Sequence, residues 1–404
     1  MSLFIVRILV ITSMSVALFY SCVTIAQSAF QTNINAFEFE LTSRNSDTAK
    51  PNVLTMLSSR LADLNVPGAG VAVIENGELI WAHGFGTQLA GKSMPVDENT
   101  VFSVGSVSKM VNAALILRLV AEGKLDLDTD VNKYLKSWRV EQSRFSQKNK
   151  VTLRAILSHT AGFSQHGFAD FQPEEELPTA LQTLNGEWPA KHRAVRLMFT
   201  PGSAMDYSGG GTTVSQVMIE DVTGLSYPAA AEKYVFSPLG MTRSTFLNPL
   251  PASHGNIARG HNRYGNPTAL PRGWEAMPEM AASGLWTSAY DLGLFLSGLI
   301  KSYHQKNGFI PQELIKDMMA RVPNSHYGLG PIIKTVQQTK VFYHGGANDS
   351  YQAWLEGHLH SQSGIIILTN GSNGGSLFRE IRSIADSTFN WQVTADEVFK
   401  KPKL

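Results

Sequence analysis

The chain has 404 residues, of which 43 % are hydrophobic and only 17 % are charged, and its formal net charge is +1. This length allows one large domain or two modest ones with a substantial core. No basic stripe runs along the sequence, which argues against nucleic acid as a partner.

The N-terminal segment is typical of a secretory signal peptide. Arg7 precedes an apolar run over residues 8–20, and the letters AQS at residues 26–28 fit the small-x-small pattern of a signal-peptidase site. We therefore expect residues 1–28 to be removed and the mature protein to be periplasmic or secreted. Removal would also take away the only cysteine, Cys22, and with it disulfides and cysteine catalysis. Two alternatives stay open, an uncleaved membrane anchor and a lipid anchor on Cys22.

Residues 29–50 are polar and lack clear periodicity, so we interpret them as a linker. The first periodic segment, residues 53–64, places leucines at helical spacing. Two β-type runs then flank an Asn-Gly pair at residues 76–77, which predicts a hairpin. The main folded domain is expected to extend over residues 51–395 and to be followed by a tail at residues 396–404.

The middle of the chain, about residues 99–331, is rich in helical runs, at 109–122, 212–223 and 290–301. Strand-like runs return in KVFYHGG, YQAWLEGHL and GIIILTNG, and a final helix is expected at about residues 377–391. The fold class is therefore α+β: one antiparallel sheet built from both chain ends, flanked by helices, with a mostly helical lobe inserted. A cleft between the two lobes is the natural place for a site.

The first candidate for chemistry is the pair Ser106 and Lys109, which opens the apolar run FSVGSVSKMVNAALILRLV. Gly105 frees the backbone for a tight entry into a helix, and the lysine, one turn on, shares a face with the serine. A cation there lowers the cost of a serine alkoxide, and a deprotonated lysine can take the serine's proton. An N-cap serine with a solvent-facing lysine is the alternative. Ser-x-x-Lys occurs nowhere else in the chain.

Tyr207 is the second candidate, since it precedes four small residues, Ser208 to Gly211, that leave the backbone open to a ligand. A nearby Lys109 cation would favour the phenolate, so that Tyr207 could act as a general base. The alternative is a tyrosine packed under a loop.

The third candidate is His344, followed by Gly345 and Gly346 between two strand-like runs. The glycines would let a substrate lie along the strand edge. The imidazole could meet a substrate carboxylate or hold Tyr207, and its charge would vary near neutral pH. A purely structural strand histidine is the alternative.

Ser-x-x-Lys, then Tyr-Ser-x, then His-x-Gly, in this order, resembles the penicillin-recognising serine hydrolases. These include class C β-lactamases, low-molecular-weight D-Ala-D-Ala peptidases, D-aminopeptidases and related esterases. The flanking segments LSHTAGF, PLGMTRSTF and ASGLWTSAYDL are similar too, and the resemblance extends over about residues 53–391. The ordered triple is far more specific than any single motif.

The resemblance implies that Ser106 is the acylated nucleophile and that Lys109 and Tyr207 handle its proton. It also implies an oxyanion hole made by the backbone N–H groups of Ser106 and Ala347, and substrate contacts from the remaining motif residues, namely His344, Gly345, Gly346, Ser208 and Gly209.

Two departures from the family pattern matter. Position 209 is Gly where the family usually has Asn, which weakens the case for efficient β-lactam hydrolysis. Position 344 is His where β-lactamases commonly have Lys, and His occurs there in relatives of the peptidase and esterase type.

The sequence therefore predicts an exported serine hydrolase that works through an acyl-enzyme on amides or esters. The leading substrates are D-amino-acid peptides of the cell-wall type, with weaker β-lactamase activity and simple esters as alternatives. A non-turnover protein that binds penicillin or a peptide is the alternative from another class. We expect no cofactor or metal, since His358 and His360 lack a third ligand at zinc spacing and are interpreted as a surface turn. The expected partner is a small molecule or peptide, with peripheral envelope association left open.

Overall fold

The computed structural model describes residues 31–38, 40, 57–268, 276–336, 338–391 and 393–400. The expected signal peptide, Cys22 and most of the expected linker lie outside these residues. None of the described helices is long and apolar enough to cross a bilayer.

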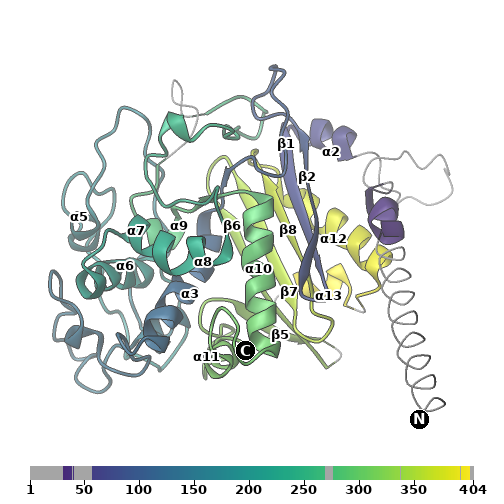
Figure 1. The fold of residues 1–404 in the computed structure, drawn as a ribbon. Coiled ribbons are helices and arrows are strands. Elements are labelled where there is room, and N and C mark those ends of the chain that lie inside the picture. The colour runs from purple at the N-terminus through teal and green to yellow at the C-terminus, as the bar shows by residue number, and fades with distance from the viewer. Residues whose placement is uncertain are drawn as a thin grey trace, which may run out of the picture.

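A six-stranded antiparallel sheet forms the frame of the molecule (Figure 1). Its order is β2-β1-β8-β7-β6-β5, so that β1, from the N-terminal part, lies beside β8, from the C-terminal part. This arrangement confirms the predicted sheet built from both chain ends. The strands are β1 (Gly68–Glu75), β2 (Glu78–Gly86), β5 (Ile332–Val336), β6 (Thr339–Ala347), β7 (Gln352–His358) and β8 (Ser363–Thr369). A small second sheet pairs β3 (Phe102–Ser103) with β4 (Trp286–Thr287).

The predicted hairpin joins β1 and β2 through Asn76 and Gly77, whose φ angles are 51° and 77°. Both residues are in the left-handed region, which is what a type I′ turn requires and what the Asn-Gly pair permits. Strand β5, which directly follows the predicted helical lobe, was not among the predicted strand-like runs.

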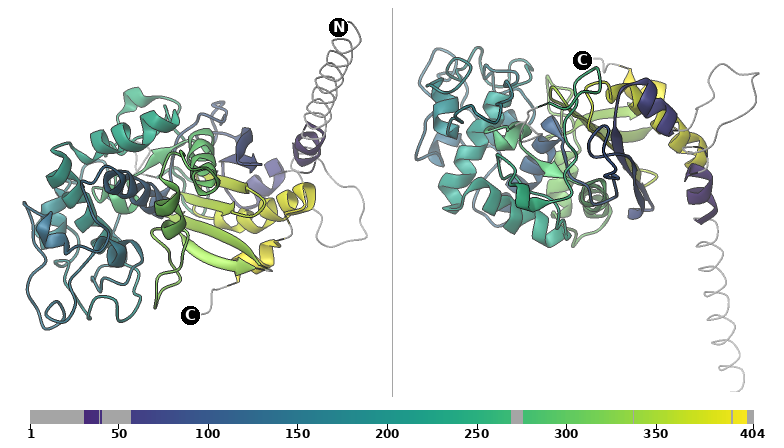
Figure 2. Two further views of the ribbon diagram at one scale, coloured as in Figure 1. Left: turned by 60° about the horizontal axis from the view of Figure 1, so that its bottom comes forward. Right: turned by 90° about the horizontal axis from the view of Figure 1, so that it is seen from above.

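Helices cover both faces of the sheet. Helix α10 (Ala289–His304) packs across β1, β2, β7 and β8 on one face, and α12 (Gly375–Phe389) packs against β7 and β8 on the other (Figure 2). The two faces of β1 accordingly belong to two cores, because its side chains alternate between them. Beyond α10 the inserted segments make the helical lobe: α3 (Ser108–Ala121), α4 (Leu153–Leu157), α5 (Ala180–Asn185), α6 (Gly209–Thr223), α7 (Tyr227–Ala231), α8 (Ser237–Leu239), α9 (Met280–Ser283) and α11 (Gln312–Met318).

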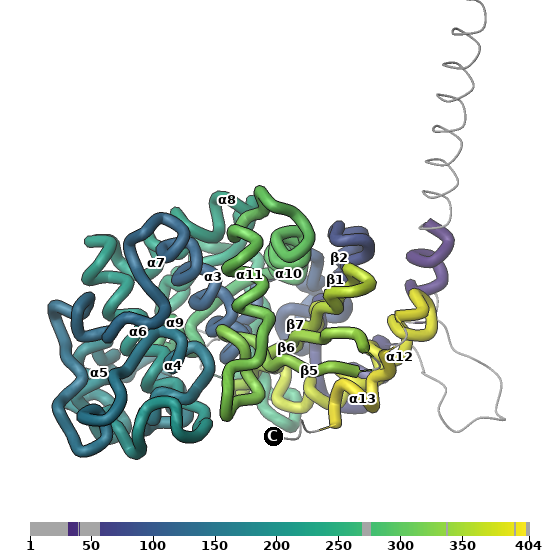
Figure 3. The backbone as a smooth tube through the Cα atoms, turned by 90° about the horizontal axis from the view of Figure 1, so that it is seen from below, coloured from purple at the N-terminus to yellow at the C-terminus, as the bar shows by residue number. Residues whose placement is uncertain are grey.

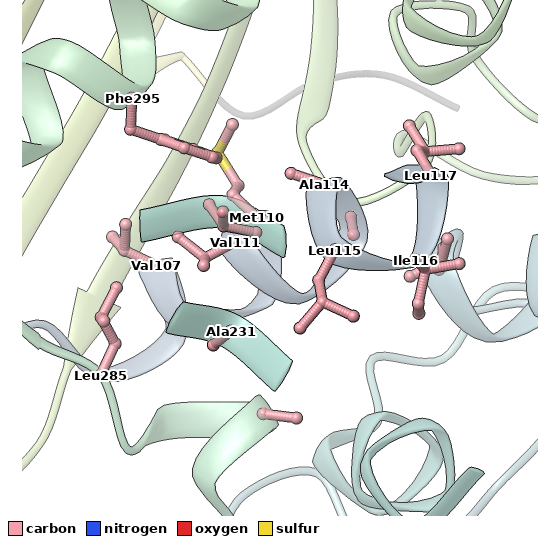
Figure 4. Close-up of a cluster of buried hydrophobic side chains, with 14 of the residues drawn as sticks. Val107, Met110, Val111, Ala114, Leu115, Ile116, Leu117, Ala231, Leu285 and Phe295 are labelled. Atoms are coloured by element: carbon pink, nitrogen blue, oxygen red, sulfur yellow. The ribbon is translucent and has the colours of Figure 1, made fainter. Parts of the chain in front are cut away.

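Helix α3 lies on the side of the helical lobe that faces the sheet, as Figure 3 shows. Eleven of its fourteen residues are buried, which is typical of a helix that is apolar all round and forms the centre of a core. Met110 and Val111 pack near Phe295 of α10 and Leu285 (Figure 4). Because this helix is fixed by core packing on every side, the residues at its start are held rigidly at the boundary between the lobes.

Two expectations about the chain ends need correction. Residues 31–38, expected in a linker, are helical, and the fully buried Phe37 contacts the Trp81 ring edge-on at 5.2 Å between centroids. The tail was expected to begin at residue 396, but residues 395–399 form helix α13 (Ala395–Phe399). A capping box made by Thr394 and Glu397 starts this helix. Phe399 packs on Trp354 with 4.6 Å between ring centroids. In both cases aromatic burial against the sheet, which periodicity alone does not reveal, orders the segment.

His358 is not in a surface turn, as the sequence had suggested, but is the fully buried last residue of β7. Its Nε2 lies 2.6 Å from Oε1 of Glu356, and Arg382 of α12 donates to the same carboxylate oxygen at 2.7 Å. We call Glu356, His358 and Arg382 the outer cluster, since they lie on the sheet face covered by α12. Among the described residues there is no group of three or more His, Cys, Asp or Glu side chains placed to hold a metal.

Candidate active site

Ser106 lies in a single 3₁₀ turn, η1 (Gly105–Val107), that leads directly into α3. Gly105 has a φ of +47°, and a Cβ there would lie 2.9 Å from the carbonyl oxygen of Ala347. The position therefore needs glycine both for its backbone angle and for the close approach of β6. The serine is thus placed against the end of β6, at the boundary between the lobes.

Lys109 lies one turn on and is 5 % exposed. Its Nζ is 3.2 Å from Oγ of Ser106 and donates to the backbone carbonyl of Ala282 in α9 at 2.7 Å. No carboxylate among the described residues forms an ion pair with it. Burial without an acidic partner lowers the pKa of Lys109 to about 7, because desolvation disfavours the ammonium form. A substantial fraction of the amine is then neutral at physiological pH and able to accept a proton.

Tyr207 presents its ring to Lys109, with Nζ 4.8 Å from the ring centroid. Burial raises the pKa of Tyr207 well above its usual value, and the hydrogen bond with Ser106 opposes this only in part. The expectation that the phenolate would be favoured is therefore wrong. Its physical basis was a Lys109 cation, but the same burial that raises the pKa of the phenol lowers the pKa of Lys109, so that only part of the amine is charged at neutral pH. Of the two groups, Lys109 therefore has the lower pKa, and the Tyr207 hydroxyl beside it is protonated.

Two histidines that sequence reasoning did not select hold Tyr207 in place. The ring of His159 lies 4.3 Å from that of Tyr207, and the ring of His166 lies 4.8 Å away, measured between centroids. The Nδ1 atom of His159 accepts the backbone N–H of Ser208 at 3.2 Å. His159 has a φ of +59°, a left-handed conformation for which the segment LSHTAGF gave no signal.

Ser208 and Gly209 lie at the start of α6, and the Ser208 side chain stabilises the local structure. The Ser208 hydroxyl donates to the carbonyl of Ser164 at 2.8 Å and accepts the N–H of Gly211 at 2.9 Å as an N-cap, so the expected substrate contact by this side chain is not supported. A Cβ on Gly209 would lie 2.9 Å from the Phe168 ring. Phe168 thus occupies space that a side chain at position 209 would need.

The end of β6 contributes the third part of the site. This strand pairs with β7 along residues 341–347 but with β5 only along residues 339–343, so one edge of residues 344–347 is open toward η1. A Cβ on Gly346 would lie 1.9 Å from the carbonyl oxygen of Val104 and 3.1 Å from the N of Ser106. Glycine therefore permits the strand to approach the backbone of Val104 and Ser106. The backbone of Ala347, whose side chain is exposed, lies beside the same turn.

His344 is 3 % exposed, and its Nδ1 donates to the carbonyl of Gly345 at 2.7 Å. Its Nε2 has no hydrogen-bond partner among the described residues. Burial, with the nearby Lys109 amine, lowers the pKa of His344 to about 4. The imidazole is therefore neutral at pH 7 and its Nε2 is a buried, unpaired acceptor, in contrast to the expectation that its charge varies near neutral pH.

Ser106, Lys109, Tyr207 and His344 line one cleft of about 730 Å³, together with Gly209, Gly345, Gly346 and Ala347. Of the predicted site residues only Ser208 is missing from its walls. Among the described residues that line the cleft, Lys109 is the only lysine, arginine, aspartate or glutamate. The site is thus a largely apolar cleft that brings together the Ser106 hydroxyl, the buried Lys109 amine and the Tyr207 phenol.

This fold and this arrangement define a serine hydrolase scaffold of the penicillin-recognising class. A family model described as Beta-lactamase matches residues 55–388, and the chain belongs to that family. The match confirms the resemblance found in the sequence.

Among curated proteins the chain is similar to Protein flp of Staphylococcus aureus (strain MRSA252), with 22 % identity over 334 residues, or 81 % of this chain and 64 % of flp. It thus matches less than two thirds of the length of that relative. It is also similar to Esterase EstB of Burkholderia gladioli, with 27 % identity over 289 residues, or 63 % of this chain and 70 % of EstB. Among solved structures, the octameric penicillin-binding protein homologue from Pyrococcus abyssi has a TM-score of 0.67 at 24 % identity, covering 84 % of this chain and 77 % of that one.

Proposed function

We propose that this protein is a serine hydrolase that cleaves neutral carboxylic esters, and related amides, through an acyl-enzyme on Ser106. The observation that carries the proposal is the buried, unpaired Lys109 amine, 3.2 Å from Oγ of Ser106 and with a pKa of about 7. A perturbed amine beside a hydroxyl in a cleft is the arrangement that activates a nucleophile at neutral pH.

In the acylation step, neutral Lys109 takes the proton of Ser106 while Oγ forms a bond to the carbonyl carbon of the substrate. The negative charge moves to the carbonyl oxygen, which the N–H groups of Ser106 and Ala347 stabilise. The bond to the leaving group then breaks as Tyr207 gives its hydroxyl proton to the departing oxygen or nitrogen, and Tyr207 recovers a proton from the Lys109 ammonium. In the second half the same groups activate a water molecule, which releases the acid and frees Ser106.

The charge of the cleft supports esters over the D-amino-acid peptides that the sequence favoured. A free C-terminal carboxylate needs a cationic partner, but His344 is neutral and Lys109 is engaged with Ser106 and Ala282. The similarity to an esterase agrees with this preference. Phe168, which fills the space beside Gly209, removes the room for the family's asparagine, so we propose that β-lactam hydrolysis is weak or absent.

The proposal is tested by labelling with a fluorophosphonate probe and mapping the adduct by mass spectrometry. Wild type should be labelled on Ser106, and Ser106→Ala should lose labelling and at least about 10⁴-fold of its esterase activity. Ser203→Ala is the matched control, since this exposed serine bonds only to the carbonyl of Thr200 and should change nothing. A label that maps to Ser108 or Ser208 would contradict the proposal.

Turnover of nitrophenyl acetate separates a hydrolase from the alternative of a non-turnover binding protein. We expect many turnovers per Ser106 rather than a single stoichiometric burst. A burst without further product would favour the binding protein.

We also propose that the protein is exported, on the basis of Arg7, the apolar run at residues 8–20 and the AQS pattern at residues 26–28. N-terminal sequencing of the mature protein should start near Phe30. Met1 at the N-terminus would overturn the proposal, and a lipid on Cys22 would favour the anchored form.

A further inference from the structure

The candidate cleft does not end at the nucleophile but continues across the open edge of β6 to the opposite side of that strand. At position 345 the missing side chain would point toward Trp354, since a Cβ there would lie 3.5 Å from Cε3 and Cζ3 of the indole, with no closer atom. Gly345 and Trp354 are directly paired across β6 and β7, so the two positions share one face of the sheet. Glycine at this position therefore leaves a passage from the nucleophile to the indole.

The far part of this passage, which we call the outer compartment, is walled by Ile332, Trp354 and Phe378, all of which line the same cleft as Ser106. Trp354 and Phe378 are 8 % and 7 % exposed, and their rings lie 6.0 Å apart between centroids. The indole is fixed from behind, because its Nε1 donates to Oε2 of Glu356 at 3.0 Å and the Tyr343 ring stacks on it at 5.1 Å. These three walls are apolar, two of them are aromatic, and Gln352 of β7 is the polar side chain that lines the cleft nearest to Trp354 in sequence.

The proton donor indicates which end of the substrate enters this compartment. Tyr207 must lie next to the departing oxygen in order to protonate it. The Tyr207 ring faces Tyr327 at 6.0 Å between centroids, and Tyr327 forms a backbone bridge with Ile332, the first wall of the outer compartment. A continuous apolar path thus runs from Tyr207 through Tyr327 and Ile332 to Trp354.

We propose that the outer compartment binds the leaving group of the substrate and that this group is an apolar aryl or arylalkyl alcohol. The inference rests on the proposed function, and it adds the substrate class. Planar aromatic walls favour offset or edge-on contact with an aromatic ring, and the cleft offers no cation other than Lys109 among its described residues to hold a charged leaving group.

Two acetate esters, ethyl acetate and benzyl acetate, test the proposal. Both give the same acetyl-enzyme, so the ratio of their kcat/KM values reports only how the leaving group is bound in the acylation step. Wild type should prefer the benzyl ester. Gly345→Ala and Gly345→Val narrow the passage with increasing volume, and Phe378→Ala removes a wall. We expect the benzyl-to-ethyl ratio to fall by about tenfold or more in Gly345→Val and Phe378→Ala, and by less in Gly345→Ala.

Phe389→Leu is the matched control, because Phe389 belongs to the same helix as Phe378 but packs on Phe37 and Trp391, away from the cleft. It should leave the ratio as in wild type. Thermal unfolding of each variant shows whether it is folded. If Phe378→Ala does not fold, Gly345→Ala still tests the proposal, because the alanine Cβ would make only ordinary van der Waals contacts.

A ratio that stays within about twofold of wild type in the Gly345 and Phe378 variants would overturn the outer compartment as a leaving-group site. The same conclusion would follow if these variants changed the ratio of the kcat/KM values for ethyl acetate and ethyl phenylacetate instead of the benzyl-to-ethyl ratio. The compartment would then bind the acyl group and not the alcohol. Either result leaves the proposed function standing, whereas persistence of activity in Ser106→Ala would remove the proposed function itself.

Discussion

The molecule buries ionisable groups in two places, with oppositely charged partners in one and without them in the other. On the face of the sheet covered by α12, the outer cluster brings Glu356, His358 and Arg382 together, all with fully buried side chains. Attraction to Arg382 and hydrogen bonds hold the pKa of Glu356 at about 2, against the effect of burial. On the other side of β6, Lys109 is buried beside Ser106 with no acid to pair with, and its pKa falls to about 7.

The difference shows how a buried charge becomes either structural or reactive. A charge that is paired and hydrogen-bonded stays ionised over the physiological pH range and holds elements together, here β7 and α12. A charge that is buried without a counter-ion is poised to lose or gain a proton. The outer cluster should therefore matter for stability and little for chemistry, and Lys109 should show the reverse.

Lys109→Met is expected to have the largest effect on activity. Acylation should slow by about 10²- to 10⁴-fold, because the base is lost. The free energy of unfolding should fall by less than about 1 kcal/mol, since the lost hydrogen bond to Ala282 is offset by no longer burying an amine. Labelling kinetics and denaturant unfolding measure the two quantities. A stability loss as large as that of the next variant would contradict the comparison.

Arg382→Met is expected to have the largest effect on stability. It leaves the Glu356 carboxylate buried without its main counter-ion and also removes the donor to the carbonyl of Val393. The free energy of unfolding should fall by about 3–5 kcal/mol, while the folded fraction is still labelled on Ser106 at the wild-type rate. Arg379→Met is the matched control on the same helix, because Arg379 is 57 % exposed and its pair with Asp396 should contribute less than about 1 kcal/mol. Loss of labelling in folded Arg382→Met would show that the two regions are not independent.

Activity and stability should depend on pH in different ranges, because each reports on one of the two regions. Only the neutral amine of Lys109 accepts a proton, so kcat/KM should rise about tenfold per pH unit below its pKa of about 7 and level off above it. The pKa of Glu356 is lowered on folding from 4.5 to about 2, so the stability that it contributes is present above 4.5 and is lost as the pH falls toward 2. Activity should therefore fall between about pH 7 and pH 5 while this contribution stays intact. A flat activity profile across that interval would contradict the assignment of Lys109 as the base.

Much of the fold and of the site could be predicted from the sequence, because local signals and the resemblance agreed. The Asn76-Gly77 turn has a local cause, and the ordered motifs placed Ser106, Lys109, Tyr207 and His344 in one cleft, as the structure does. Their catalytic roles remain predictions that the variants above test.

What the sequence could not provide depends on three-dimensional burial. Burial lowers the pKa of Lys109 and of His344, and it raises the pKa of the Tyr207 phenol. The outer cluster joins residues 24 to 26 positions apart across a strand and a helix, so no local pattern reveals it. The helix at residues 31–38 likewise owes its order to Phe37 and its contact with Trp81.

The smallest expected effect concerns His344, the other buried histidine of the sheet. Unlike His358, it has no acidic partner, and its neutral ring presents Nε2 as an acceptor. The bond that the variant loses is one that Nε2 accepts from the substrate. A neutral hydrogen bond contributes about 0.5–1.5 kcal/mol, so His344→Ala should lower kcat/KM by roughly 2- to 12-fold. The loss should be equal for neutral esters and for peptides that carry a carboxylate, since a neutral imidazole does not select for charge. His344→Gln, which keeps an acceptor without a titratable ring, should recover part of the activity on both. A loss confined to the carboxylate peptides would instead mean that His344 is charged in the complex. D-amino-acid peptides would then be the favoured substrates, as the sequence predicted.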